Sequence, residues 1–323
     1  MLVLLWGPAA DLPLMEVRYQ LEQLDVPTKL VDQRRVLETE VEIVVGETVG
    51  GHIRVGSESI NLEEVSAVYV RPYESVNLPS IAAAGPDSVE WAHAMYVDDL
   101  LASWSELTSA LVVNRFSASA ANGSKPYQLE QIRAQGWKVP ETLITNDADD
   151  VRYFWKQNGE VIYKSVSGTR SRVSRLRAEH TERLADLSSC PTQFQQYIPG
   201  VDHRVHVVDD KVFACAVQCG ADDYRYSEND VPELRACSLS EEIEERCWAL
   251  AVAMNLSLAG IDLRCTPQGE WYCFEVNPSP AFTYYQHATG QPISQAMALL
   301  LANAAPEQYT TISLPLEYNP TRD

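Results

Sequence analysis

The chain has few basic residues and no long apolar run. Its 25 Lys and Arg residues face 45 Asp and Glu residues, a formal net charge of −20 that repels the phosphate backbone of nucleic acids. No stretch approaches the roughly 20 apolar residues of a membrane span. The apolar start over residues 1–6 has no basic segment and ends at Gly7-Pro8, too early for a signal peptide. These absences predict a cytoplasmic protein without a nucleic-acid or membrane partner.

Several common motifs are missing as well. The seven cysteines are odd in number and include no C-x-x-C pair, so we expect reduced thiols. The strand-like run that holds Cys215 and Cys219 is not typical of a zinc site. Gly7 has no G-x-G-x-x-G around it, which argues against a dinucleotide site there, and the absence of G-x-S-x-G argues against a serine hydrolase.

What the chain does have is enough length and apolar content for two or three domains, with 323 residues of which 46% are hydrophobic. The apolar run at residues 2–6, a helical pattern at 12–24 and a second run at 28–31 predict a β-α-β opening and a Rossmann-like layer. Alternating segments between residues 41 and 62 predict a hairpin that turns at Gly50-Gly51. Amphipathic helices are expected at 86–107 and 292–303, and an extended tail beyond 306.

Oxygen-bearing side chains gather in a predicted hairpin, where strands 260–265 and 271–277 are joined by a turn at 266–269. Strand residues two apart face the same way, so Glu275 and Asn277 project together, and Asp262 on the neighbouring strand completes the face. Carboxylate and amide oxygens without His or Cys favour Mg²⁺ over zinc. Because two prolines follow Asn277 closely, its backbone setting is restricted. The sequence therefore predicts a divalent-metal site.

Upstream, cations gather around one short segment. Lys164 lies in an apolar strand, where a charge is costly without an anionic partner, and residues 165–172 add hydroxyls, one glycine and further cations. This basic patch is either a solvated loop or a site that attracts an anion. Farther on, alternation sends Asp202, Arg204 and His206 to one face of a strand.

The order of these features resembles the ATP-grasp carboxylate-amine ligases. D-x(12)-E-x-N followed by Pro-Ser-Pro is similar to their magnesium signature, in particular in the ribosomal-protein glutamate ligase branch, and the hairpin followed by SAVYVRP resembles the N-terminal domain of graspetide peptide ligases. The resemblance implies an α/β and α+β fold, with a Rossmann-like pre-ATP-grasp domain and two α+β ATP-grasp subdomains that hold ATP between them. The implied bounds are 1–115 for the first domain, 116–190 and 191–310 for the two subdomains, and 311–323 for the tail.

The resemblance also implies roles for individual residues. Nucleotide contacts are expected from Lys125, Lys164, Ser167, Gly168, Thr169, Gln195, Gln196, Tyr197, Ile198 and Asp202. Mg²⁺ is expected on Asp262, Glu275 and Asn277, with two ions and with Mn²⁺ as a substitute, and catalytic cations at Arg204 and Arg264. Substrate contacts are expected from Arg71, Arg170, Arg172 and Ser279. Two departures from the family pattern are the single glycine of the phosphate loop and Gln196, where many members carry Glu.

The implied reaction activates a carboxylate as an acyl phosphate with release of ADP and joins it to an amine. The acid and amine, peptide or small molecule, are not revealed, nor is a general base. Two alternatives stay open: a graspetide-type macrocyclase that forms esters or amides in a precursor peptide, and a non-catalytic ATP-binding regulatory protein on the same fold. The oligomeric state is open too, a homo-oligomer included.

Overall fold

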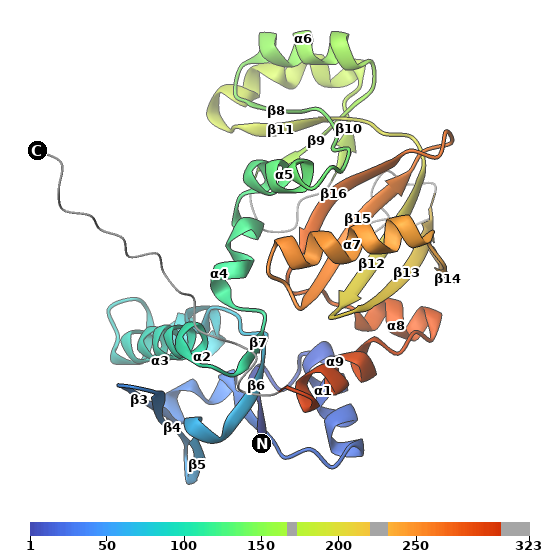
Figure 1. Ribbon diagram of the computed structural model, residues 1–323. Helices are drawn as coiled ribbons and strands as arrows, with labels where there is room; N and C mark the ends of the chain where they lie inside the picture. Colours follow the sequence, from blue (N-terminus) through green and yellow to red (C-terminus); the bar gives the residue numbers. More distant parts are fainter. Residues whose placement is uncertain (167–172, 220–231, 305–323) are drawn as a thin grey trace, which may run out of the picture. The chain divides into compact units, whose positions relative to one another are not determined.

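The structure is a computed structural model that describes residues 1–166, 173–219 and 232–304. The chain divides into two compact units (Figure 1). The first unit comprises Met1–Ser117 with the C-terminal segment from Met297, and the second comprises Ala118–Ala296. The expected subdivision of the second unit at residue 190 stays a prediction.

The first unit is built on a parallel sheet with the strand order β2-β1-β6-β7. Its strands are β1 (Leu2–Gly7), β2 (Thr28–Asp32), β6 (Val65–Val70) and β7 (Leu111–Val113). The two central strands, β1 and β6, are buried at nearly every position, as expected for parallel strands covered on both faces. Helix α1 (Leu12–Gln23) follows β1 and buries Leu14, Val17 and Leu21. The expected β-α-β opening is confirmed.

Helix α3 (Val89–Leu107) begins three residues later than residue 86, the predicted start. The reason is Ser88, whose hydroxyl accepts a hydrogen bond from the amide of Trp91 at 3.1 Å and caps the helix. The helix buries Val97, Leu101 and Trp104 in the core of this unit. Short helices of the unit are η1 (Gln33–Glu38), η2 (Leu62–Glu64), η3 (Ser75–Asn77) and α2 (Pro79–Ala84). Helix α4 (Phe116–Ser119) contains the boundary between the two units in the sequence.

A small antiparallel sheet, β3 (Thr39–Val45), β4 (Val49–Val55) and β5 (Glu58–Asn61), corrects the predicted hairpin. The turn lies at residues 46–48, and Gly50 and Gly51 are paired inside β4. Gly51 has a φ of 118°, and a Cβ there would overlap the carbonyl oxygen of Glu42. The glycines therefore allow close approach of two strands, which is the other common use of glycine in sheets.

The smaller sheet of the second unit is antiparallel, in the order β10-β9-β11-β8. Its strands are β8 (Thr142–Thr145), β9 (Val161–Ser165), β10 (Ser174–Arg175) and β11 (Thr192–Gln196). Together with α6 (Ala148–Asn158) and η5 (Ala178–Ser189) it encloses a core that contains Val151, Leu184 and Phe194. The predicted phosphate loop falls largely on residues 167–172, outside the described residues.

The larger sheet of this unit has the order β14-β13-β12-β15-β16. Its strands are β12 (Val201–Val208), β13 (Lys211–Gln218), β14 (Glu233–Cys237), β15 (Leu258–Cys265) and β16 (Trp271–Asn277). Helices α5 (Lys125–Ala134) and α7 (Glu241–Ala253) share one core with the sheet, to which Ile132, Val205, Leu250 and Ile261 belong. The predicted β15–β16 hairpin is confirmed, with its turn closed by the bond from Thr266 N to Glu270 O at 2.8 Å.

Two helices end the described chain. Helix α8 (Thr283–Thr289) was not predicted; it ends at Gly290, which has a left-handed φ of 73°. Helix α9 (Ile293–Ala302) agrees with the predicted helix to within a residue at each end. The predicted tail lies outside the described residues. Among the helices of the described chain, none combines the length and the apolar character needed to cross a membrane.

Candidate nucleotide and metal site

Two D-x-R segments on neighbouring strands form the centre of the site. On β12 and β15, Asp202 lies opposite Arg264 and Arg204 lies opposite Asp262, because antiparallel pairing reverses one segment against the other. Arg264 donates to Asp202 through Nε at 2.6 Å and Nη2 at 2.8 Å. Arg204 donates through Nη1 to Asp262 at 2.6 Å. The two predicted catalytic arginines are thus paired reciprocally, Arg264 with the predicted nucleotide contact Asp202 and Arg204 with the predicted metal ligand Asp262.

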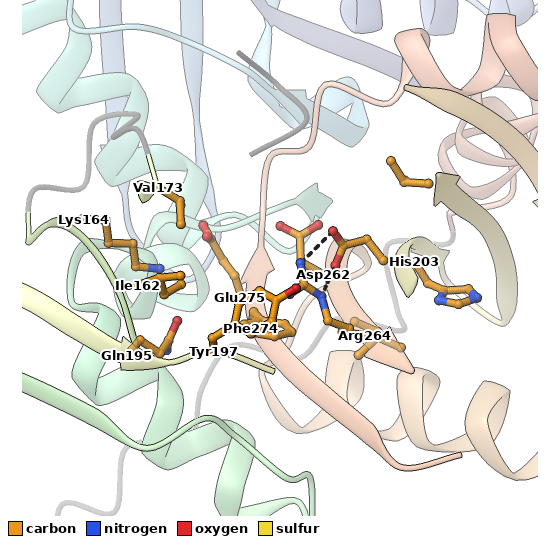
Figure 2. A pocket seen from close by; sticks show the side chains of 13 residues that line it. Ile162, Lys164, Val173, Gln195, Tyr197, His203, Asp262, Arg264, Phe274 and Glu275 are labelled. Atoms are coloured by element: carbon orange, nitrogen blue, oxygen red, sulfur yellow. Dashed lines mark hydrogen bonds and ion pairs between the residues drawn. The ribbon is translucent and has the colours of Figure 1, made fainter. Parts of the chain in front are cut away.

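Strand β16 adds Glu275 beside Asp262 by means of a β-bulge. Asp262 pairs with Glu275 while Leu263 pairs with Cys273, so Phe274 is the extra residue. Cys273 is fully buried, and strict alternation from it would turn Glu275 into the core. The bulge instead brings Phe274 and Glu275 to the pocket together (Figure 2).

Lysines surround the Glu275 carboxylate. It accepts a hydrogen bond from Nζ of Lys125, which also donates to Asn122 Oδ1 at 3.1 Å. Burial alone would raise the pKa of Glu275, but Lys125, Lys164 and Arg204 outweigh burial and lower that pKa below its ordinary 4.5. Glu275 is therefore ionised at neutral pH. Its negative charge is balanced by Lys125, Lys164 and Arg204, the cations that were expected to contact the nucleotide phosphates.

This lowered pKa predicts an acid-dependent contribution to stability. A carboxylate with a depressed folded-state pKa stabilises the fold above its unfolded pKa, and the contribution is lost as the pH falls through the folded pKa. In metal-free protein, Glu275→Gln should lower the melting temperature at pH 7, and the difference from wild type should shrink as the pH falls below about 4.5. Thermal unfolding at a series of pH values measures this; a constant difference would contradict it.

The end of β16 is held by Gln128, which sequence reasoning missed. From α5, its side-chain amide donates to the Val276 carbonyl at 2.7 Å and accepts from the Val276 amide at 3.1 Å. This two-point contact fixes the backbone between Glu275 and Asn277. A fully buried Gln on the apolar face of a helix was the available signal, since buried polar side chains need partners.

The pocket extends from the two D-x-R segments to the smaller sheet (Figure 2). Lys164 and Ile162 reach it from β9, Gln195 from β11, and Phe274 from the bulge. The lining of the pocket therefore combines apolar and aromatic side chains with carboxylates and cations. Such a mixed lining suits a ligand that has both an apolar part and a charged part.

The segment predicted to read adenine lines this pocket through Gln195 and Tyr197. Gln195 is buried, and its Nε2 donates to Thr142 Oγ1 at 3.0 Å. The amide of Tyr197 donates to Glu160 O at 2.9 Å, and that of Gln196 to Glu141 O at 2.8 Å. The carbonyl of Ile198 accepts from Arg264 Nη1 at 2.8 Å. This segment therefore joins the two sheets of the second unit.

The remaining predicted residues are Arg71, Ser279 and those of the phosphate loop. Arg71, in the first unit, forms a buried ion pair with Asp11 at 2.6 Å, and its expected contact with substrate stays a prediction. Ser279 follows the metal segment, and its amide donates to Asn277 Oδ1 at 2.9 Å. Ser167, Gly168, Thr169, Arg170 and Arg172 lie outside the described residues.

The chemistry of the donor set fits Mg²⁺. Among the described residues no three His, Cys, Asp or Glu side chains gather in an arrangement suited to a metal. The site offers two carboxylates, Asp262 and Glu275, and the amide of Asn277, the last opposite Gly260 in the strand register. Mg²⁺ is commonly held by one or two carboxylates together with water and substrate phosphates, so this sparse set of oxygens is suitable.

The second unit has the architecture of an ATP-grasp module, with a polar and apolar pocket between two antiparallel sheets. The model of the RimK-like ATP-grasp domain matches residues 124–301. Since this is more than half of the chain, the protein belongs to the RimK-like ATP-grasp family, and the resemblance noted from the motifs is confirmed.

Similar proteins extend the comparison. Beta-citrylglutamate synthase B of Homo sapiens is 26% identical over 221 residues, which cover 64% of this chain and only 56% of that protein. The macrocyclase MdnC of Microcystis aeruginosa MRC, solved with the precursor peptide MdnA, has a TM-score of 0.80 at 24% identity and covers 94% of this chain and 100% of its own. The ATP-grasp ligase PsnB, solved with a phosphomimetic variant of a minimal precursor, Mg and ADP, has a TM-score of 0.77 at 26% identity over 93% of this chain and 97% of its own.

Proposed function

We propose that this protein is an ATP-dependent ligase that activates a carboxylate as an acyl phosphate, releases ADP and joins the acyl group to an amine. The observation that carries the proposal is one pocket in which Lys164, Arg264 and Glu275 meet. Membership of the RimK-like ATP-grasp family supports it, as does the similarity to PsnB, a ligase whose structure was solved with Mg and ADP.

Each cation has a task in this reaction. Lys125 and Lys164 lie around Glu275 and would contact the nucleotide phosphates, while Arg204 and Arg264 would neutralise charge on the transferred phosphoryl group. Aligning the substrate carboxylate with the γ-phosphate supplies most of the remaining rate enhancement, because phosphoryl transfer depends on positioning and charge.

The metal would be held by Asp262, Glu275 and Asn277. When bound, Mg²⁺ supplies positive charge to the phosphate oxygens and orients them. Asp262 and Glu275 are ion-paired with Arg204 and Lys125, so both carboxylates already lie in a setting that compensates negative charge.

The first test is the nucleotide product. Incubation with ATP, Mg²⁺, hydroxylamine and a library of amino acids and acidic peptides should yield ADP and a hydroxamate, because hydroxylamine captures an acyl phosphate. Product analysis by chromatography and mass spectrometry measures both. AMP in place of ADP would exclude the acyl-phosphate route, and Mg²⁺-dependent ATP binding without any product would favour the regulatory ATP-binding protein.

A second candidate is macrocyclisation of a precursor peptide through esters or amides. It is supported by PsnB, an ATP-grasp ligase solved with a minimal precursor, which resembles this chain over 93% of its length at 26% identity. The two candidates differ in their products. A macrocyclase lowers the mass of one peptide by one water for each bond formed, whereas an intermolecular ligase joins two molecules into a heavier product.

A further inference from the structure

His206 is a buried polar residue that no expected role uses. It lies on β12 two residues from Arg204 and is fully buried. Its Nδ1 has no hydrogen-bond partner among the described residues, which costs stability in a core. Packing alone would favour an apolar side chain at this position. The contacts of the other ring nitrogen, Nε2, therefore have to explain why the residue is a histidine.

That other nitrogen contacts Arg204. Nε of Arg204 donates to His206 Nε2 at 3.5 Å, a long hydrogen bond, while Nη1 of the same guanidinium donates to Asp262 at 2.6 Å. Burial, and then the charge of Arg204, hold the pKa of His206 well below 6.5, so the ring is neutral and Nε2 keeps the lone pair that accepts this bond.

Tyr285 and Gly260 complete the surroundings of the guanidinium. The Tyr285 ring lies 5.2 Å from the His206 ring, and Arg204 Cζ lies 5.7 Å from its centroid. A Cβ on Gly260 would overlap Arg204 Nη2, so the missing side chain provides the space that this nitrogen occupies. The guanidinium is thus oriented through Nε, Nη1 and Nη2 and is covered by one aromatic ring.

We propose that His206 is a positioning residue for Arg204, which it holds, with Tyr285 as a cover, in the orientation that meets the γ-phosphate of the nucleotide. The proposal rests on the proposed function, because it requires Arg204 to contact the phosphoryl group. His206 touches neither substrate nor metal in this scheme and acts only through Arg204. On this view the histidine is present because its Nε2 accepts a hydrogen bond from Arg204, and the unpartnered Nδ1 is the cost in stability of having that acceptor.

Two substitutions separate the acceptor from the ring. His206→Phe keeps a ring beside Tyr285 but removes the acceptor, and His206→Gln keeps an acceptor oxygen but removes the ring. Val207→Ala is the control, because Val207 is buried in the core shared with α7 and its loss should weaken the same strand without touching Arg204.

The experiment measures binding of adenylyl imidodiphosphate, a non-hydrolysable ATP analogue, and of ADP to the full chain by calorimetry with Mg²⁺. The wild type should prefer the triphosphate analogue, and His206→Phe should lower that preference about tenfold with unchanged ADP affinity, since a hydrogen bond to a charged group is lost. His206→Gln should retain most of the preference. Val207→Ala should melt lower than the wild type and keep the preference, so that stability and preference are measured separately.

Three outcomes would overturn the proposal: an unchanged preference in His206→Phe, an equal loss in Val207→Ala, or no triphosphate preference in the wild type. A wild-type protein that binds neither nucleotide would instead contradict the proposed function itself. If His206→Phe does not fold, His206→Leu takes its place, because leucine also removes the acceptor; an unchanged preference in folded His206→Leu would overturn the proposal, and a loss confined to that variant would support it.

Discussion

Glu275→Gln should reduce Mg²⁺-dependent turnover by roughly 10²- to 10³-fold, the size of effect seen when one charge-stabilising group is removed from an active site. Glutamine keeps an oxygen at this position but not the negative charge that attracts Mg²⁺ and balances Lys125. Turnover is measured as ADP release, and Mg²⁺ dependence as calorimetric nucleotide affinity with and without the ion.

The same change should cost stability without abolishing the fold. Lys125 and Glu275 have side chains 15% and 25% exposed, so a partly buried cation loses its anionic partner at a cost of about 1–3 kcal/mol. Glu270→Gln is the control, because Glu270 lies in the same hairpin and pairs with Lys138 at the surface. The turnover of Glu270→Gln should equal that of the wild type. Full Mg²⁺-dependent activity in Glu275→Gln would remove the metal assignment.

Much of the site could be predicted because strand alternation is a local property. Arg204 and His206 were expected on one face of their strand, and in the structure Nε of Arg204 donates to Nε2 of His206. The pairing of Asp202 with Arg264 was not foreseen, since it depends on the register between strands about 60 residues apart in sequence. Register is set by the turns and cores of the whole sheet rather than by the two segments themselves.

The features that escaped prediction are those in which one residue has two common uses. Gly50 and Gly51 fit a turn as well as a close strand contact, and only the position of Glu42 decides between them. Phe274 is the extra residue of the β-bulge, and no local sequence signal distinguishes a bulged strand from a regular strand that is one residue longer. Gln128 and His206 become meaningful only when their partners, Val276 and Arg204, are known.

A single methyl group at Gly260 should inactivate the protein. The Cβ of Gly260→Ala would overlap Arg204 Nη2 and lie 2.7 Å from Pro280 Cβ. Arg204 cannot yield without giving up its bond to Asp262, so we expect ADP release to fall by roughly 10²- to 10³-fold, as for loss of a charged group at the phosphate. Overpacking should also cost about 1–3 kcal/mol of the free energy of unfolding.

Gly269→Ala, in the turn of the same hairpin, separates the loss of turnover from the loss of stability. No atom lies within 4 Å of a Cβ at Gly269, but its φ of 81° is unfavourable for alanine, so this variant should lose about 1–2 kcal/mol of stability and keep wild-type ADP release. Chemical unfolding and turnover are measured for both variants. Equal losses of turnover in the two would show that activity follows stability of the hairpin, whereas a loss confined to Gly260→Ala would tie activity to the orientation of Arg204.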